Sequence, residues 1–165
     1  MTTTESDDQT LVTPEMVERK GVWGSARLSP PVSESDIRKW AIAVYWPETP
    51  PRLYWDEAYA KTTRWGGIVA PREFNPFAWP AERPAHILKY DAPLSPGTRA
   101  MNGGVTEKYG TPMRAGDVIE SRTAVVKFDE RQTSLGLTLF THKETRWTNQ
   151  RGEWVKTRTA INIEY

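Results

Sequence analysis

This 165-residue sequence contains no cysteine, which excludes disulfide bonds and thiolate chemistry and is compatible with a cytoplasmic setting. No apolar run is long enough to span a bilayer, so we expect no membrane partner. Lys and Arg number 22 against 21 Asp and Glu and are spread along the chain, so bulk charge does not favour nucleic acid. The two histidines, His86 and His142, lack the spacing of metal ligands, so we expect no metal site.

The N-terminus is short of apolar residues. Its first ten residues, MTTTESDDQT, are polar and acidic, which is unlike a signal peptide and typical of a disordered tail. We therefore predict a disordered segment over residues 1–12 and a single folded domain over residues 13–165. That length is enough to bury a core.

The first half of the chain has the pattern of helices. Ser33 or Ser35 can cap a helix over residues 36–45, whose apolar side chains recur at the spacing of one helical face: Ile37, Trp40, Ala41 and Val44. Prolines end this helix, and a short helical stretch follows near residues 56–62. The sequence then reads WGGIVAP over residues 65–71, in which Gly66 and Gly67 permit positive φ or a close backbone approach.

The second half has the alternation of strands. We predict strands over residues 99–109 and 118–128, a polar hairpin loop over Asp129–Gln132, a strand from about Leu135 onward, and a terminal strand over residues 155–165. Within the first of these, Gly103 and Gly104 indicate a bulge or the close approach of another backbone or a ligand. Long strands joined by tight turns form an antiparallel sheet that the helical half must cover, which is an α+β domain.

Tryptophan is abundant, with eight in the chain. Most can be explained by packing in the core and in loops. Trp46, Trp55, Trp65 and Trp79 are close together in predicted loops, where large rigid side chains also suit a binding groove or a subunit interface.

Four segments carry a resemblance to a known family. They are LYWDEAYAKTTRWGGIVAP (residues 53–71), AMNGG (100–104), TPMRAGDVI (111–119) and WTNQRGEWV (147–155). Together they resemble the MaoC-like hydratase/dehydratase family, most closely its N-terminal-type or FAS1-like dehydratase members, over about residues 21–165. The resemblance implies a hot-dog fold, in which a curved antiparallel sheet wraps around a central helix and subunits pair into a continuous sheet.

The resemblance breaks at the catalytic loop. Active members carry a Gly-Asp-x-Asn-Pro-Leu-His loop, in which the Asp and His activate water and a backbone N–H polarises the thioester carbonyl. Here Tyr45 is at the Gly, Trp46 at the Asp, Glu48 at the Asn and Tyr54 at the His. The loop is also three residues longer, because Trp46 and Tyr54 are eight positions apart and the motif's Asp and His are five. Neither Trp nor Tyr is a base near neutral pH, so the resemblance assigns no catalytic residue.

Other residues of this region could still bind a ligand or do chemistry. Glu48, Asp56 and Glu57 are nearby carboxylates, although a carboxylate at a helix start is more often a cap. The residues that remain for substrate binding are small or aromatic and lie in the Gly-rich segments: Trp65, Gly66, Gly67, Asn102, Gly103 and Gly104.

Three functions are consistent with these patterns. The leading hypothesis is a non-catalytic, acyl-binding subunit of a heteromeric enoyl-CoA hydratase or 3-hydroxyacyl dehydratase, with the Asp and His on a second hot-dog subunit in a heterodimer or heterotetramer. Its ligand would be an acyl-CoA or acyl-carrier thioester, including a bulky lipid or steroid side chain, with coenzyme A as part of the substrate and no separate cofactor. The alternatives are a self-sufficient hydratase using Asp56 or Glu48, and an acyl-thioester-binding scaffold for a partner enzyme such as a thiolase.

Overall fold

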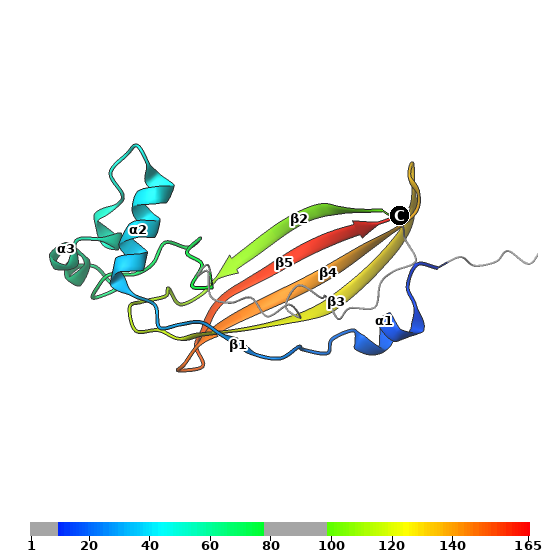
Figure 1. The fold of residues 1–165 in the computed structure, drawn as a ribbon, viewed down its shortest axis with the longest axis horizontal. Coiled ribbons are helices and arrows are strands. Elements are labelled where there is room, and N and C mark those ends of the chain that lie inside the picture. Colours follow the sequence, from blue (N-terminus) through cyan, green and yellow to red (C-terminus); the bar gives the residue numbers. More distant parts are fainter. Residues whose placement is uncertain (1–9, 78–98) are drawn as a thin grey trace, which may run out of the picture.

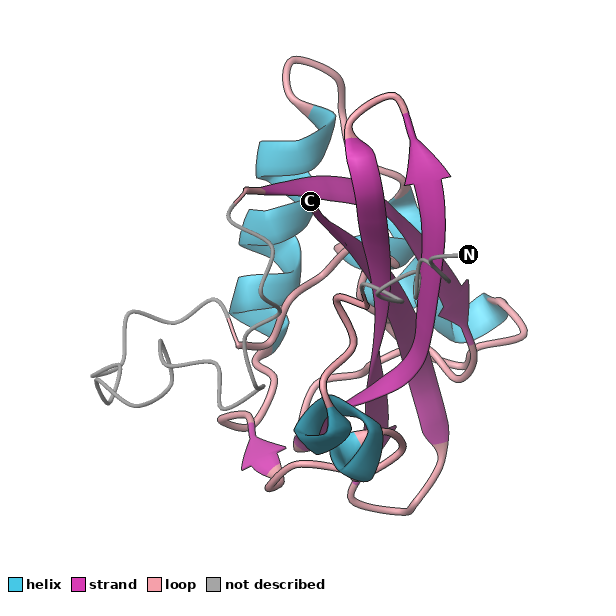
Figure 2. Ribbon diagram, turned by 90° about the vertical axis from the view of Figure 1, so that its right-hand side faces the viewer, coloured by secondary structure: helices cyan, strands magenta, loops and turns pink. Residues whose placement is uncertain are grey.

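The computed structural model describes residues 10–77 and 99–165, and within them five strands form one antiparallel sheet. The strand order is β1-β3-β4-β5-β2, with the bounds β1 Arg27–Leu28, β2 Ala100–Tyr109, β3 Ile119–Thr133, β4 Gly136–Asn149 and β5 Trp154–Glu164. The four long strands lie side by side in Figure 1, and Figure 2 shows them turning relative to one another across the sheet. This curved antiparallel sheet confirms the predicted hot-dog α+β class.

The helices lie in the first half of the chain, as predicted. They are α1 (Pro14–Arg19), α2 (Glu34–Tyr45), the 3₁₀ turn η1 (Arg52–Tyr54) and α3 (Glu57–Thr62). Ser33 caps α2 by accepting a hydrogen bond from the backbone N–H of Asp36 at 3.0 Å. In Figure 1, α2 and α3 gather at the end of the sheet where β2 finishes, so their cover is concentrated at that end. None of the helices in residues 10–77 and 99–165 is long and apolar enough to cross a membrane.

The core lies where these helices meet the sheet. Ile37 of α2, Ala60 of α3, Ile119 of β3, Trp147 of β4 and Val155 of β5 are buried in one cluster. Residues 74–77 complete it, because their aromatic rings pack edge-on against Trp40 at 5.7 Å and Trp147 at 5.4 Å between ring centroids. Burying such side chains contributes about 1.5–3 kcal/mol each, so the first half of the chain is held at this end of the sheet.

One predicted loop is wrong. Residues Asp129–Gln132 are part of β3, and the hairpin turns at residues 134–135, between Thr133 and Gly136. The polar residues have partners along the strand: Asp129 lies 3.4 Å from the Arg131 guanidinium, which in turn sits 4.0 Å from the centroid of the Phe140 ring. A strand whose polar side chains pair with one another gives no apolar alternation, so its sequence resembles a loop.

The predicted bulge in β2 is confirmed. The register between β2 and β5 shifts between Asn102 and Gly104, which leaves Gly103 as the extra residue. A Cβ at Gly103 would lie 2.8 Å from the side chains of Ile161 and Ile163, so this position is close-packed against β5. Gly104 has φ +123°, a conformation that L side chains rarely adopt, so both glycines are required by the sheet itself.

The described chain begins at residue 10, close to β3. The Thr10 hydroxyl donates a hydrogen bond to the Glu130 carboxylate at 2.8 Å, and the backbone N–H of Leu11 donates to the same carboxylate. The predicted disordered tail falls mostly on residues 1–9, which lie outside the described residues, as do Trp79 and His86.

Candidate functional site

The position of the catalytic Asp faces solvent. Helix α2 ends at Tyr45, and Trp46 caps it with its backbone N–H bonded to the Ile42 carbonyl at 3.1 Å. The Trp46 side chain is 78 % exposed. The next turn is closed by the N–H of Glu48, which donates to the Tyr45 carbonyl at 2.8 Å. No group able to accept a proton near neutral pH therefore lies at this position.

The position of the catalytic His holds a paired phenol. The rings of Tyr54 and Tyr45 lie 6.1 Å apart at an interplanar angle of 36°. Burial raises the pKa of Tyr54 above its usual 10.0, and the hydrogen bond with Tyr45 and the negative charge of Glu73 raise it further. Tyr54 consequently stays protonated at neutral pH and cannot act as a base. Tyr54, which replaces the motif's His, therefore contacts Tyr45, which replaces the motif's Gly.

The nearby carboxylates have structural roles or lie in solvent. Asp56 caps α3 by accepting from the Tyr59 N–H at 3.0 Å, and its other oxygen lies 2.6 Å from the Arg52 guanidinium. The Tyr59 N–H bond and the Arg52 interaction hold the pKa of Asp56 below its ordinary value, which weakens it as a base. Glu57 pairs with Lys61 at 2.7 Å, and Glu48 is exposed. Sequence reasoning anticipated the cap, and the structure assigns it to Asp56.

The first Gly-rich segment forms a tight turn after α3. Gly66 has φ +65° and donates its N–H to the Thr63 carbonyl at 3.0 Å, so that N–H is used within the turn. Gly67 has open space around its Cα, and the half-buried Trp65 ring lies beneath the Arg64 guanidinium at 4.3 Å. The segment is anchored further on, where the Ala70 N–H bonds the Met113 carbonyl at 2.8 Å.

The second Gly-rich segment lies elsewhere. Asn102, Gly103 and Gly104 are exposed and pair with the C-terminal end of β5. Asn102 lies seven residues before Tyr109, the last residue of β2. At about 3.3 Å per residue this is roughly 23 Å along β2 from the end that α3 and the Gly66 turn approach. The two predicted parts of the substrate site are thus not brought together within one chain, and their role in binding stays a prediction.

A polar cluster that sequence reasoning missed lies on the sheet between β5 and β2, and we call it the Lys156 cluster (Lys156, Glu107, Tyr109 and Arg158). The Lys156 residue is only 4 % exposed. Its ammonium lies 3.4 Å from the Glu107 carboxylate and 4.1 Å from the centroid of the Trp147 ring. Tyr109 donates a hydrogen bond to the same carboxylate, which the Arg158 guanidinium approaches at 3.9 Å.

The cluster has one titrating carboxylate and a phenol that stays neutral. Burial acts to raise the pKa of Glu107, but the Tyr109 hydrogen bond and the Lys156 and Arg158 charges together hold it below its ordinary 4.5. The same hydrogen bond, with burial, raises the pKa of Tyr109 to about 12. A register shift explains why Lys156 is buried, since the extra residue of β5 opposite Trp147–Thr148 leaves Val155 and Lys156 both facing inward. No alternation pattern could have revealed this.

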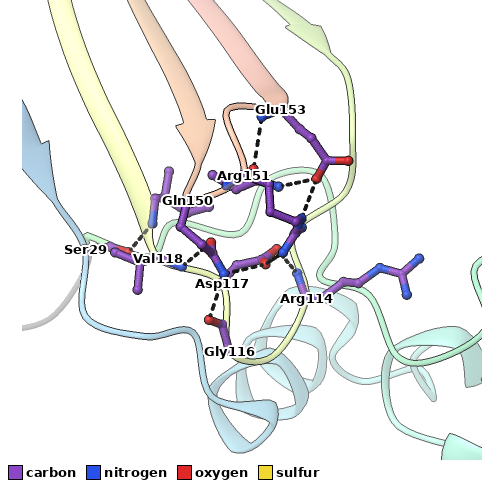
Figure 3. A network of polar contacts seen from close by, with 10 residues as sticks. Ser29, Arg114, Gly116, Asp117, Val118, Gln150, Arg151 and Glu153 are labelled. Carbon is purple, nitrogen blue, oxygen red and sulfur yellow. Dashed lines mark hydrogen bonds and ion pairs between the residues drawn. The ribbon is translucent and has the colours of Figure 1, made fainter.

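The two turns that carry a specific part of the family resemblance are joined by hydrogen bonds. Asp117, 2 % exposed, accepts from the Arg114 N–H at 2.9 Å and from the Arg151 guanidinium at 2.9 Å. The Gln150 side-chain oxygen accepts from the Val118 N–H at 2.9 Å, and its amide nitrogen reaches the Gly116 carbonyl at 3.3 Å. Figure 3 shows these side chains converging from two separate turns at the base of the sheet. The Arg-Ala-Gly-Asp and Asn-Gln-Arg-Gly-Glu segments therefore have a structural role: their hydrogen bonds hold the two turns together.

Two open grooves border the core cluster. One has a volume of about 360 Å³ and the other about 330 Å³, and Asn75 lines both. The first is bordered by Trp40 and Phe74, and the second by Thr123, Thr145 and Trp147. Within the described residues, no group of three His, Asp or Glu side chains could hold a metal ion.

Comparison of the sequence with family models gives one match. Residues 19–158 match the family model described as the FAS1-like, dehydratase domain region, which is most of the chain. No curated protein matches the sequence closely enough to count as a relative.

Solved structures share the fold. The ChsH1–ChsH2 complex from Mycobacterium tuberculosis is similar at a TM-score of 0.69 and 20 % identity, covering 92 % of this chain and 94 % of that one. The HadBC (3R-hydroxyacyl-ACP dehydratase) complex from the same organism is similar at 0.55 and 18 %, covering 84 % and 95 %. The (R)-hydratase from A. caviae involved in PHA biosynthesis is similar at 0.55 and 17 %, covering 84 % and 93 %. At these identities the likeness concerns the fold.

Proposed function

Because this chain belongs to the FAS1-like dehydratase family, we propose that it is the non-catalytic, acyl-thioester-binding subunit of a heteromeric enoyl-CoA hydratase or 3-hydroxyacyl dehydratase. One observation carries the proposal: the positions of the family's Asp and His hold an outward-facing Trp46 and the Tyr54 phenol paired with Tyr45. General acid–base catalysis contributes about 10²–10⁴-fold per group, so a chain lacking both groups retains mainly binding.

The free edge of the sheet supports a partner subunit. Strand β2 ends the strand order, no other strand in the described residues pairs with its outer side, and eight of its ten residues are exposed. An unpaired edge of this length is a template for pairing with another chain. Two solved structures of the same fold, ChsH1–ChsH2 and HadBC, are complexes. We infer that a hot-dog subunit carrying the Asp/His loop pairs with β2, in a heterodimer or heterotetramer.

Such pairing would also bring each of the predicted binding segments next to the partner subunit. When two edge strands run antiparallel, the start of one lies beside the end of the other. Asn102–Gly104 would then face the end of the partner's edge strand, and the Trp65–Gly67 turn would face its start. The acyl group would lie between subunits, which accounts for two Gly-rich segments that do not meet within one chain.

The proposed ligand is an acyl-CoA or acyl-carrier thioester, including one with a bulky lipid or steroid side chain. Coenzyme A enters as part of the substrate, no separate cofactor is needed, and the setting is cytoplasmic. The self-sufficient alternative is less consistent with the geometry, because Asp56 is committed to the α3 cap and to Arg52.

The test is co-expression with a hot-dog protein that has an intact Asp/His loop, encoded beside this chain, followed by light scattering and an enoyl-CoA hydration assay. We expect a stable heteromer that hydrates the substrate, while either subunit alone does so poorly or not at all. Hydration by this chain alone, lost in Asp56→Asn, would instead identify a self-sufficient enzyme. A heteromer that binds acyl-CoA without hydrating it would favour the scaffold.

A further inference from the structure

The face of the sheet that carries the Lys156 cluster is polar along the stretch that holds it. Ser121, Thr123, Thr145 and Trp147 line one groove and so share this face. Directly opposite residues point to the same side, which adds Arg158, opposite Thr145, and Lys156, opposite Trp147. Glu107 and Tyr109 of β2 follow, opposite Arg158 and Lys156. An apolar helix or acyl chain would gain little by lying on this stretch.

Positive charge exceeds negative charge there. The Glu107 carboxylate lies near two cations, Lys156 at 3.4 Å and Arg158 at 3.9 Å, and accepts a hydrogen bond from the Tyr109 hydroxyl. The Arg72 guanidinium lies 5.6 Å from the centroid of the Tyr109 ring. The negative charge of the neighbouring Glu73 contributes to the raised pKa of both Tyr54 and Tyr109. Around Glu107 and Tyr109 together there are thus three cations, Arg72, Lys156 and Arg158, and two carboxylates, Glu107 and Glu73.

The accessible donor is Arg158. Its side chain is 52 % exposed, whereas that of Lys156 is 6 % exposed. A contact at 3.9 Å to Glu107 is too long for a hydrogen bond, so within residues 10–77 and 99–165 no hydrogen bond occupies the guanidinium's five N–H donors. A planar guanidinium with free donors suits a phosphate or carboxylate in bidentate geometry. Lys156 adds charge from below, and Arg72 adds it from the end of β2.

We propose that Arg158, supported by Lys156 and Arg72, recognises an oxyanion on the bound thioester. This inference rests on the proposed function. The oxyanion is either a phosphate of the carrier or a carboxylate on the acyl group. The site lies beside strand β2, where the partner subunit would pair, so a ligand held between subunits would pass it.

The probes are four commercial molecules in two matched pairs, titrated calorimetrically into the full-length chain and into the heteromer. 4′-Phosphopantetheine is compared with pantetheine, which lacks the phosphate, and butyrate is compared with butyramide, which lacks the carboxylate. We expect the more highly charged member of one pair to bind about tenfold more tightly, since a charge-assisted bidentate contact is about that strong, and to weaken as salt increases. The pair that shows the difference identifies the source of the oxyanion.

The variant Arg158→Gln should abolish that tenfold difference, and Arg158→Lys should retain part of it. Arg122→Gln is the matched control, because Arg122 is 49 % exposed, bonds Glu120 on the same strand and lies on the opposite face. If Arg158→Gln does not fold, Arg72→Gln, at an exposed position, should reduce the difference. Equal affinities within both pairs, or a difference that survives in Arg158→Gln, would overturn the proposal. Hydration by the heteromer despite that result would leave the proposed function standing.

Discussion

The two turns at the base of the sheet and the loop after α2 both correspond to characteristic motifs of the family, yet only the turns are retained. The turns are held by Asp117, buried and bonded to Arg114 and Arg151, so their residues determine how β3 and β5 begin. The loop ends in an exposed Trp46 and a Tyr54 that contacts Tyr45. A motif that builds the fold must be kept by any folded member, whereas a motif that supplies only chemistry can be lost when another subunit supplies it.

The strongest way to break this comparison is to restore the chemistry. We expect Trp46→Asp combined with Tyr54→His to give no enoyl-CoA hydration by the isolated chain, at least 10²-fold below an intact family member. The loop is three residues longer and position 46 faces solvent, so the two groups would not meet over a substrate. The measurement is steady-state hydration of crotonyl-CoA, with circular dichroism to confirm folding. Activity within tenfold of an intact member would mean that the loop still has a catalytic geometry.

The turns should be the region where a single carboxylate matters most for stability. Asp117→Ala leaves the partly buried Arg114 N–H without its acceptor and removes the Arg151 partner, so we expect a loss of about 2–3 kcal/mol in the free energy of unfolding. Urea denaturation measures it. Asp56→Ala, which removes a cap in the loop region, is the matched comparison and should cost clearly less. Equal losses would remove the distinction between the two regions.

Replacing a glycine by alanine should also cost more stability beside the turns than in the loop region. A Cβ at Gly110, just before the 111–117 turn, would collide with the Trp154 carbonyl oxygen, which is backbone and cannot move aside. Gly110→Ala should therefore cost about 2 kcal/mol. Gly67→Ala, where nothing lies within 4 Å, should leave the midpoint of urea unfolding unchanged. A neutral Gly110→Ala would show that the β2–β5 ends can separate freely.

The smallest effect expected is a pH dependence from the Lys156 cluster. The pKa of Glu107 is lowered in the folded state, so its contribution is present above its ordinary 4.5 and is lost as pH falls through the lower folded value. Unfolding followed between pH 7 and pH 3 should show this loss, and Glu107→Gln should flatten that part of the profile. A variant with the same acid profile as the parent would mean that Glu107 carries no such linkage.

Much of the fold was predictable because its signals are local. The spacing of Ile37 and Ala41 predicted α2, the glycine pair predicted the β2 bulge, and the alternation after Val155 predicted β5. What was missed depends on register. The Asp129–Gln132 segment is a strand because its polar side chains have partners on the same sheet.

The site was harder to predict than the fold for the same reason. Lys156 is buried only because one extra residue in β5 turns it inward, and its partner Glu107 is 49 positions away in sequence. The separation of Gly66 from Gly103 likewise follows from the direction of β2, which no composition or spacing reveals. Residue identity predicted the loss of the catalytic pair, but three-dimensional placement was needed to find what occupies that end of the sheet.

The bulge at Gly103 also bears on the life of this chain before assembly. In the proposed heteromer, a newly made subunit would have β2 uncovered until its partner binds, and a long regular edge would let copies pair with one another without limit. The register shift at Asn102–Gly104 interrupts the ladder, leaving Gly104–Tyr109 as the longest regular stretch of that strand, with the charged Lys108 within it. We expect an orphan subunit built in this way to remain dispersed at concentrations where a smooth edge would seed aggregates, which gives assembly time to find the correct partner.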